Sequence, residues 1–284
     1  MRSRPFFANV DESKRASLAE KNYAFRSLVL PASSGRSEIR RMKMLARFAV
    51  ALSLASAVAT SHAQSAWVAD YSRLVGKYAT PEGVRYGAWK SNAADLQALE
   101  NVVNGIAQDN VGALGQTEQL AFYINAYNAW ILHEALEKYP TKSVKDALYT
   151  FFTGKRIRVA GEEMSFNRLE KEIIIPRFKE PRVHVALNCA SRSCPPLLSE
   201  PFRADKLEGQ LEKLATGFVN SDRGVNLSAD NKTAELSKIF DWYKDDFKAG
   251  GGALAFINKR RKTPVPQDAK VSYQDYDWAL NEAK

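Results

Sequence analysis

One segment, residues 117–138, constrains the fold more than any other because its pattern leaves no polar face. Thr117 is a typical helix N-cap, Glu118 suits the first helical turn, and Pro140 stops the helix. At about 100° per residue, large apolar side chains point to almost every side of such a helix. It therefore has to be surrounded by protein. We predict a single, mostly helical α+β domain built around this buried central helix.

Shorter elements are indicated on both sides of the central helix. Pro81 and Gly83 mark a turn, and Pro176 is expected to end a helix. The other predicted helices are 67–78, 88–106, 143–153, 166–175, 202–219, 238–248 and 253–259. The predicted strands are a hairpin over 156–165, then 182–189 and 271–273. These few short strands predict one small sheet, most simply antiparallel.

Residues 42–63 have the three parts of a secretory signal peptide. A basic stretch precedes the apolar run 48–59, and Ser61 and Ala63 occupy the −3 and −1 positions of a cleavage site before Gln64. The apolar run is well short of the ~20 residues that span a bilayer. We expect cleavage and export to the periplasm or the medium, with no stable membrane span afterwards. A buried helix or a retained anchor is the alternative.

Residues 1–41 precede this signal, whereas signal peptides normally begin at the N-terminus. We expect them to be a disordered or over-extended start, with translation beginning at Met42 or Met44. Residues 1–63 hold eleven of the 41 basic and four of the 32 acidic residues, so the net charge falls from +9 to +2 without them. A value near zero gives no support for a nucleic-acid partner. Residues 64–284 are expected to form one domain.

The segment around the two cysteines is the first candidate for chemistry. Cys189 and Cys194 could form a disulfide in an oxidising compartment. Alternatively, Cys189 is a nucleophile that is activated by a base and faces backbone donors of the turn 190–193. A soft metal held by His184 and both thiols, or a labile redox disulfide, is a further alternative. On a strand over 182–189, His184 and Cys189 would point to opposite faces, which weakens a direct pair.

The chain lacks several common catalytic and nucleotide-binding motifs. It has no G-x-S-x-G elbow, no H-E-x-x-H and no glycine-rich phosphate-binding loop. We therefore predict no metal and no cofactor.

Polar side chains on the central helix form the second candidate group. Asn125 and Asn128 lie three residues apart and project in neighbouring directions, with Glu118 close to the direction of Asn125. A buried asparagine needs partners, because an unpaired polar group costs about 1–3 kcal/mol. Either both asparagines tie neighbouring loops to the helix, or they orient a ligand or a catalytic side chain.

Several ordered segments carry a resemblance to a known family. They are residues 121–129, 139–144, 164–170, 184–197, 240–247 and 276–281. Together they resemble the domain-of-unknown-function family DUF547, in the form of a bacterial exported member, with the family core at about 112–222. The family has no established activity. Its pattern favours Cys189 over Cys194, because some intracellular relatives carry serine at the latter position. Lys171 stands where many members have histidine, which leaves Glu170 as a candidate base or orienting carboxylate, or as a solvent-facing residue.

Two functional hypotheses follow. The first is a Cys-dependent hydrolase or acyl-transferase of the bacterial envelope, with Cys189 as nucleophile and His184 or Glu170 as base or orienting group. Its substrate would be an unidentified small molecule, peptide or envelope component, and Trp242 and Tyr243 would line a groove beside it, unless they belong to the core. The second is a non-catalytic envelope binding or scaffold module stapled by a Cys189–Cys194 disulfide.

Overall fold

The computed structural model describes residues 66–145, 152–154 and 157–284. All of them lie in Ser65–Lys284, the second of two units into which the chain divides. The signal-like segment, residues 1–41 and most of the predicted helix 143–153 lie outside the described residues. The described part is a helical α+β domain with two small sheets, which confirms the predicted fold class. None of its helices is long and apolar enough to cross a membrane.

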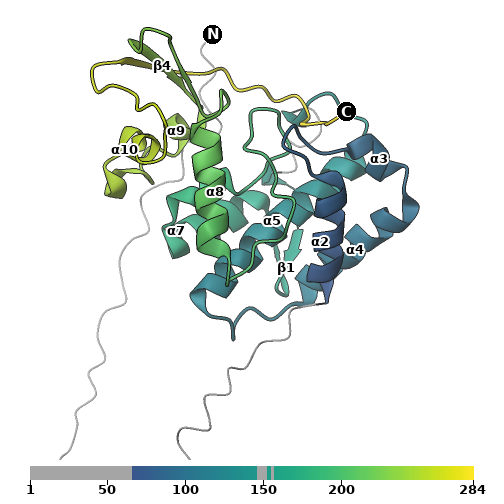
Figure 1. Ribbon diagram of the computed structural model, residues 1–284. Coiled ribbons are helices and arrows are strands. Elements are labelled where there is room, and N and C mark those ends of the chain that lie inside the picture. The colour runs from purple at the N-terminus through teal and green to yellow at the C-terminus, as the bar shows by residue number, and fades with distance from the viewer. Residues whose placement is uncertain (1–65, 146–151, 155–156) are drawn as a thin grey trace, which may run out of the picture. The chain divides into compact units, whose positions relative to one another are not determined.

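The central helix is α5, Gln116–Lys138, and most of its side chains are buried, as predicted. In the view of Figure 1, α2 and α4 lie on one side of it and α7 on the other. The N-cap is Gly115 rather than Thr117, so this prediction was wrong. The Glu118 carboxylate accepts a hydrogen bond from the Gly115 N–H across 2.8 Å. The Glu118 carboxylate thus bonds a backbone N–H at the start of the helix, and the helix begins before the predicted cap at Thr117.

Among the residues described before α5, the helices are α2 (Trp67–Tyr78), α3 (Tyr86–Lys90) and α4 (Ala93–Gln108). The bounds of α2 are those predicted. The predicted helix 88–106 is instead broken in two, because the Asn92 side chain accepts a hydrogen bond from the Asp95 N–H across 3.0 Å. Asn92 therefore caps a new helix where the apolar pattern alone indicates continuity.

Asp95 fastens α2 to α4. Its buried carboxylate accepts hydrogen bonds from three side chains of α2, namely Lys77 at 2.7 Å, Tyr78 at 2.7 Å and Arg73 at 2.5 Å. These hydrogen bonds hold the pKa of Asp95 well below its usual range. The contact between the two helices is thus polar at its centre and depends on an ionised carboxylate.

After α5 come β1 (Ile157–Val159), β2 (Glu162–Met164), η1 (Arg168–Ile174) and α7 (Ile175–Phe178). The two strands pair antiparallel, which confirms the predicted hairpin. The helical segment runs on through Pro176, so the predicted end at this residue was wrong. Proline is tolerated in the first turn of a helix, and Pro176 stands there in α7.

The predicted strand 182–189 is not a strand. Pro181–Val185 form a 3₁₀ turn, η2, and residues 186–189 follow as irregular backbone. The Glu180 carboxylate begins the turn by accepting a hydrogen bond from the Arg182 N–H across 3.0 Å. Val183 packs in the core around α5, and Val185 packs in a second core in the C-terminal part. Burial of the two valines in different cores, rather than pairing with another strand, explains their apolar alternation.

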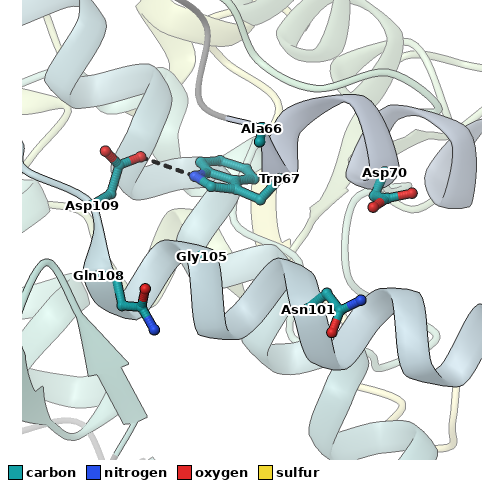
Figure 2. A pocket seen from close by; sticks show the side chains of 7 residues that line it. All are labelled: Ala66, Trp67, Asp70, Asn101, Gly105, Gln108 and Asp109. Atoms are coloured by element: carbon teal, nitrogen blue, oxygen red, sulfur yellow. Dashed lines mark hydrogen bonds between the residues drawn. The ribbon is translucent and has the colours of Figure 1, made fainter.

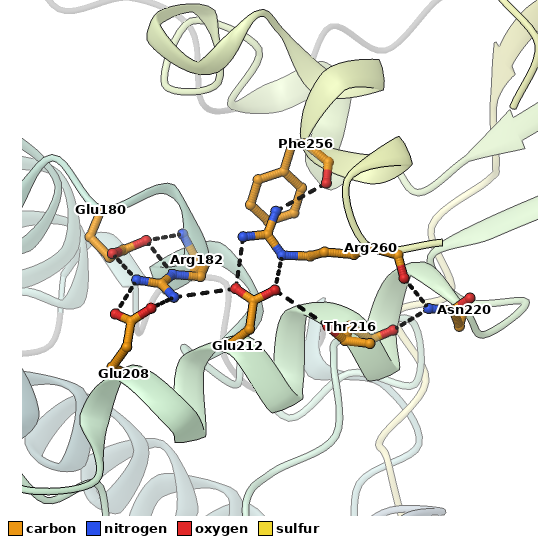
Figure 3. A network of polar contacts seen from close by, with 8 residues as sticks. All are labelled: Glu180, Arg182, Glu208, Glu212, Thr216, Asn220, Phe256 and Arg260. Atoms are coloured by element: carbon orange, nitrogen blue, oxygen red, sulfur yellow. Dashed lines mark hydrogen bonds and ion pairs between the residues drawn. The ribbon is translucent and has the colours of Figure 1, made fainter. Parts of the chain in front are cut away.

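Ion pairs join η2 to the helix α8, Leu207–Val219 (Figure 3). The Arg182 guanidinium contacts Glu180 at 2.6 Å and Glu208 at 2.6 Å. Glu212 of α8 contacts Arg182 at 3.3 Å and the Arg260 guanidinium at 2.8 Å. This network fixes the start of the segment that leads to both cysteines.

The C-terminal part contains β3 (Val225–Leu227), β4 (Thr233–Leu236), α9 (Ile239–Trp242), η3 (Lys248–Gly250), α10 (Ala253–Asn258) and β5 (Lys270–Tyr273). β4 pairs antiparallel with β3 and parallel with β5, so this sheet is mixed. The predicted helix 238–248 is shorter than expected. Beyond β5 the chain returns to the α5 core through isolated bridges from Ala279 to Ser143 and from Leu280 to Ser191.

Candidate functional site

The two cysteines lie in one turn, and Asn188 shapes that turn from inside the protein. Its buried side chain accepts a hydrogen bond from the Ala190 N–H at 2.9 Å and donates one to the Pro195 carbonyl at 2.7 Å. Ala190 has a φ of 61°, in the left-handed region that non-glycine residues seldom occupy. Such backbone strain is common at functional sites and persists only where the surroundings enforce it.

The returning C-terminal segment closes over this turn. The Arg192 N–H donates to the Ala279 carbonyl at 2.8 Å, and the Asn281 N–H donates to the Ala190 carbonyl at 2.9 Å. These hydrogen bonds bring Tyr276 to the cysteines from a distant part of the chain. The turn is therefore held on one side by Asn188 and on the other by the C-terminal segment.

Cys189 is half-buried, and its sulfur lies among hydroxyl groups. Its Sγ is 3.0 Å from Ser191 Oγ and 3.4 Å from the Tyr276 hydroxyl, and these two oxygens are 3.0 Å apart. The neighbouring Cys194 thiol, together with Ser191 and Tyr276, lowers the pKa of Cys189 to about 6 against the opposing effect of burial. At neutral pH this thiol is therefore mostly the thiolate, which is the nucleophilic form.

Cys194 lies beneath Cys189 and is buried. Its Sγ accepts a hydrogen bond from the Cys189 N–H across 3.0 Å. Burial raises the pKa of Cys194 well above its usual range, so this thiol stays protonated at neutral pH. Both cysteines are free thiols, and the disulfide considered from the sequence is not formed in this structure.

His184 is not paired with Cys189. Its Nε2 lies 2.9 Å from Asp246 Oδ2, and its ring stacks on Tyr243 with centroids 3.9 Å apart. Because residues 181–185 form a 3₁₀ turn, the argument from opposite strand faces was wrong, although its consequence holds. Within the described residues, no hydrogen bond joins His184 to either thiol.

Glu170 is buried rather than solvent-facing, and two phenols hold it. The hydroxyl of Tyr127 donates to its carboxylate across 3.2 Å, and the hydroxyl of Tyr243 donates to the other carboxylate oxygen. Burial, then Glu170 and then Cys189 raise the pKa of Tyr127 well above its usual range, so Glu170 and the thiol act on the same region. Within the part of the chain that the structure describes, no hydrogen bond joins Glu170 to Cys189. The next residue is Lys171, whose pKa is lowered by burial.

The two asparagines of α5 bind backbone, as one of the two sequence hypotheses states. Asn125 bonds both the N–H and the carbonyl of Phe202 at 2.8 Å, which explains why α8 begins later than position 202. Asn128 accepts a hydrogen bond from the Asn188 N–H at 2.8 Å and donates to a neighbouring carbonyl. Asn128 thereby holds the residue before Cys189. Glu118 caps α5 and contacts neither asparagine.

Aromatic rings flank the thiol. Trp242 lies 4.8 Å from Tyr276 and 5.8 Å from Trp278, measured between ring centroids. All three side chains are half-buried. The predicted pair is divided between two roles, because Trp242 belongs to this aromatic group beside Cys189, whereas Tyr243 bonds Glu170.

The sequence interpretation missed Ser191 and Tyr276 as site residues. Both lie within segments that carry the family resemblance, but nothing local indicates that they meet, because 85 positions separate them. The described residues contain no group of three or more His, Cys, Asp or Glu side chains that could hold a metal ion.

A hollow of about 370 Å³ lies elsewhere, between α2 and α4 (Figure 2). Its lining includes Asp70, Asn101 and Trp67, and the Trp67 indole donates to Asp109 across 2.9 Å. Gly105 lets the helices approach, because a Cβ there would lie 2.8 Å from the Cβ of Trp67. None of the sequence-predicted site residues lines this hollow.

Fold and site together define an α+β protein with two free thiols in one strained turn. Residues 111–219 match the model of a family described as "Protein of unknown function, DUF547". The matched part of the chain contains α5, Glu170 and both cysteines, and it is similar to that family. Tyr276 and Trp242 lie outside the matched residues. No match was found among curated proteins or among solved structures.

Proposed function

We propose that the protein is a Cys-dependent enzyme, a hydrolase or an acyl-transferase, with Cys189 as its nucleophile. The observation that carries the proposal is the position of the half-exposed Cys189 sulfur, 3.0 Å from Ser191 Oγ and 3.4 Å from the Tyr276 hydroxyl. A buried structural cysteine needs no such donors, whereas a thiolate does. The thiolate attacks the acyl carbon of the substrate and forms a thioester intermediate, which water or a second acceptor then resolves.

This mechanism needs no histidine base. A thiol that is already ionised at neutral pH attacks directly, so His184 and Glu170 are not required to remove its proton. Burial raises the pKa of Tyr276 well above its usual range. The Tyr276 hydroxyl therefore stays protonated beside Ser191 and Cys189. Substrates with good leaving groups, such as thioesters and activated esters, suit a site whose nearby proton donors are weak acids, namely the Ser191 and Tyr276 hydroxyls and the Cys194 thiol.

The donors of the turn limit how a developing oxyanion is stabilised. The N–H groups of Ala190, Arg192 and Ser193 are already bonded to Asn188 and to carbonyls of the C-terminal segment. Of the backbone donors across 190–193 that the sequence hypothesis offered, the Ser191 N–H is therefore the one left for this role. The Ser191 N–H bonds the Cys189 thiolate and is released once the sulfur forms a covalent bond. With its hydroxyl, Ser191 is thus the best-placed donor to an acyl oxygen.

The proposal places the enzyme outside the cytoplasm, in the periplasm or the medium, on the strength of the signal-like residues 42–63. N-terminal sequencing of the protein from the cell envelope tests this part. We expect a mature end near Gln64, and a mature end near Met1 would contradict export by this signal.

The catalytic part is tested with an acyl thioester probe and intact-mass measurement after an acid quench. We expect one acyl group per chain, mapped to Cys189, and none on the Cys189→Ser variant. An adduct that persists in Cys189→Ser would refute Cys189 as nucleophile. The absence of any adduct on protein that was reduced beforehand would favour the scaffold hypothesis instead.

A further inference from the structure

The two thiols of the turn differ in exposure and in charge, although they are neighbours. Cys189 is half-buried, while Cys194 is only 3% exposed. The backbone N–H of Cys189 donates a hydrogen bond to the Cys194 sulfur, which places the buried sulfur beside the backbone of the accessible cysteine. In thiol–disulfide exchange, an accessible thiolate attacks a disulfide and forms a mixed disulfide, which a second thiol close by can then resolve.

The turn holds this arrangement with its own backbone. Its end is closed by a hydrogen bond from the Cys194 N–H to the Ser191 carbonyl at 3.1 Å, and Ala190 supplies the left-handed residue that folds the chain back. The Cys194 sulfur also lies 3.6 Å from the Leu187 carbonyl. Both sulfurs are thus kept in one small loop without a bond between them.

We infer that Cys189 and Cys194 form a dithiol–disulfide couple, so that the protein exchanges disulfides with a substrate that carries one. The inference rests on the proposed function in one respect, that Cys189 is the nucleophile. It adds a second activity, in which the electrophile is a sulfur atom rather than an acyl carbon, and it assigns Cys194 as the resolving thiol. Ionisation supports the order of events, because the pKa of Cys189 is lowered while that of Cys194 is raised.

The exchange proceeds in two balanced steps. In the first, the Cys189 thiolate attacks one sulfur of the substrate disulfide, the substrate S–S bond breaks, and the other sulfur leaves as a thiolate. In the second, Cys194 gives its proton to a leaving thiolate and attacks the Cys189 sulfur. The mixed disulfide then breaks, and the second substrate sulfur leaves as a thiolate that takes a proton from water. The substrate disulfide is reduced to two thiols, and the protein dithiol is oxidised to a Cys189–Cys194 disulfide.

Closing that disulfide joins two sulfurs that are separated by four intervening residues. The sulfurs have to approach to about 2.05 Å, with Cα atoms roughly 4.4–6.8 Å apart. The loop between them is short, and its residues already make hydrogen bonds within the turn. The C-x4-C spacing differs from the common C-x-x-C spacing. The couple is therefore indicated by the juxtaposition of the two cysteines and not by a sequence motif.

The test uses the full-length chain, first reduced and then incubated with glutathione disulfide. Wild type is compared with Cys194→Ser and Cys194→Ala, and Cys189→Ser is the matched control. Incubation at about pH 8.5 keeps a substantial fraction of Cys189 as thiolate even if the variants lose the contribution of Cys194 to its ionisation. After an acid quench, intact mass and peptide mapping count the bound glutathione and locate any disulfide, and far-UV circular dichroism checks the fold.

We expect wild type to end as the Cys189–Cys194 disulfide with little bound glutathione. Both Cys194 variants should accumulate one glutathione on Cys189, at least tenfold more than wild type, and Cys189→Ser should take up none. Disulfide-bonded insulin is the second probe, and it shows whether the substrate is a protein disulfide rather than a small-molecule disulfide. Reduction of either probe supports the couple.

Two results would overturn the inference. If wild type keeps glutathione on Cys189 as stably as the Cys194 variants do, Cys194 is not a resolving thiol, although Cys189 remains a nucleophile. If neither disulfide reacts while the thioester probe still acylates Cys189, disulfide exchange is excluded and the proposed function stands. Failure of the proposed function itself differs from both, because Cys189 then takes up neither probe. The wild-type result needs no variant, so misfolding of a Cys194 variant does not remove the test.

Discussion

The backbone N–H of Cys189 donates a hydrogen bond to the sulfur of Cys194 across 3.0 Å, so the half-buried cysteine is in direct contact with the buried one. The two neighbouring cysteines nevertheless differ in acidity, because their other surroundings differ. The Cys194 thiol, Ser191 and Tyr276 stabilise the charged form of Cys189, whereas burial destabilises the charged form of Cys194. One small turn thus contains both a thiolate and a protonated thiol.

Replacement of Tyr276 by phenylalanine should make Cys189 less acidic. The variant loses one hydroxyl from the sulfur but keeps the ring that packs against Trp242. A hydrogen bond to a charged group is worth about 1.5–3 kcal/mol, so the pKa of Cys189 should rise by about 1 to 2. Thiolate absorbance near 240 nm as a function of pH measures it. Tyr273→Phe, at an exposed tyrosine, is the control and should leave the pKa unchanged. An unchanged pKa in Tyr276→Phe would show that Tyr276 does not stabilise the thiolate.

Replacement of His184 should leave the reactivity of Cys189 nearly unaltered. The imidazole bonds Asp246 and stacks on Tyr243 instead of reaching a thiol. In His184→Phe, which keeps an aromatic ring against Tyr243, we expect the rate of Cys189 alkylation near neutral pH to stay within about twofold of wild type. A base in direct contact would contribute roughly 100-fold or more. A loss of that size would therefore contradict the assignment of His184 to a structural role.

The two asparagines of α5 provide a matched pair of variants. Asn125→Ala and Asn128→Ala each leave a buried N–H and a buried carbonyl without a partner, so each should lower the free energy of unfolding by about 2–4 kcal/mol. Urea unfolding measures this loss. Only Asn128 holds Asn188, next to the reactive cysteine, so only Asn128→Ala should also change the alkylation rate of Cys189. Equal effects of both variants on that rate would contradict a specific role for Asn128.

The contact between α2 and α4 should be sensitive to acid. Because hydrogen bonds lower the pKa of Asp95 in the folded state, its stabilisation is complete above the ordinary aspartate pKa of about 3.9 and is lost as the pH falls below it. Asp95→Asn should therefore lower the free energy of unfolding by about 1–3 kcal/mol near neutral pH, with a smaller deficit near pH 3. Asp70→Asn, at a half-exposed ion pair, should cost less than about 0.5 kcal/mol. A deficit that stays constant or grows on acidification would contradict this account.

The elements that could be predicted from the sequence are those fixed by local pattern. The bounds of α2 and the hairpin at 157–164 follow from periodicity and turn residues, and the burial of α5 follows from its lack of a polar face. The strand predicted over 182–189 was wrong because an alternating apolar pattern also arises when Val183 and Val185 are buried in two different cores.

The site was predicted only in part, for a related reason. Cys189 and Cys194 stand close in sequence, and their importance follows from that. Tyr276 reaches Ser191 because the chain returns after β5 and bonds to the cysteine turn, which is a tertiary relationship without a local signal. Glu170 could be named as a carboxylate of interest, but its two tyrosine partners come from α5 and from the residue after α9.

The most direct test of the account is the rate of Cys189 alkylation by iodoacetamide as a function of pH. The full-length wild-type chain is reduced, freed of reductant and labelled between about pH 4 and 9, and peptide mass mapping separates Cys189 from Cys194. The account predicts that Cys189 reaches half of its maximal rate near pH 6, while Cys194 reacts slowly throughout. A Cys189 rate that rises only near the ordinary thiol pKa of about 8.5 would contradict the activated thiolate, and with it the proposed enzyme.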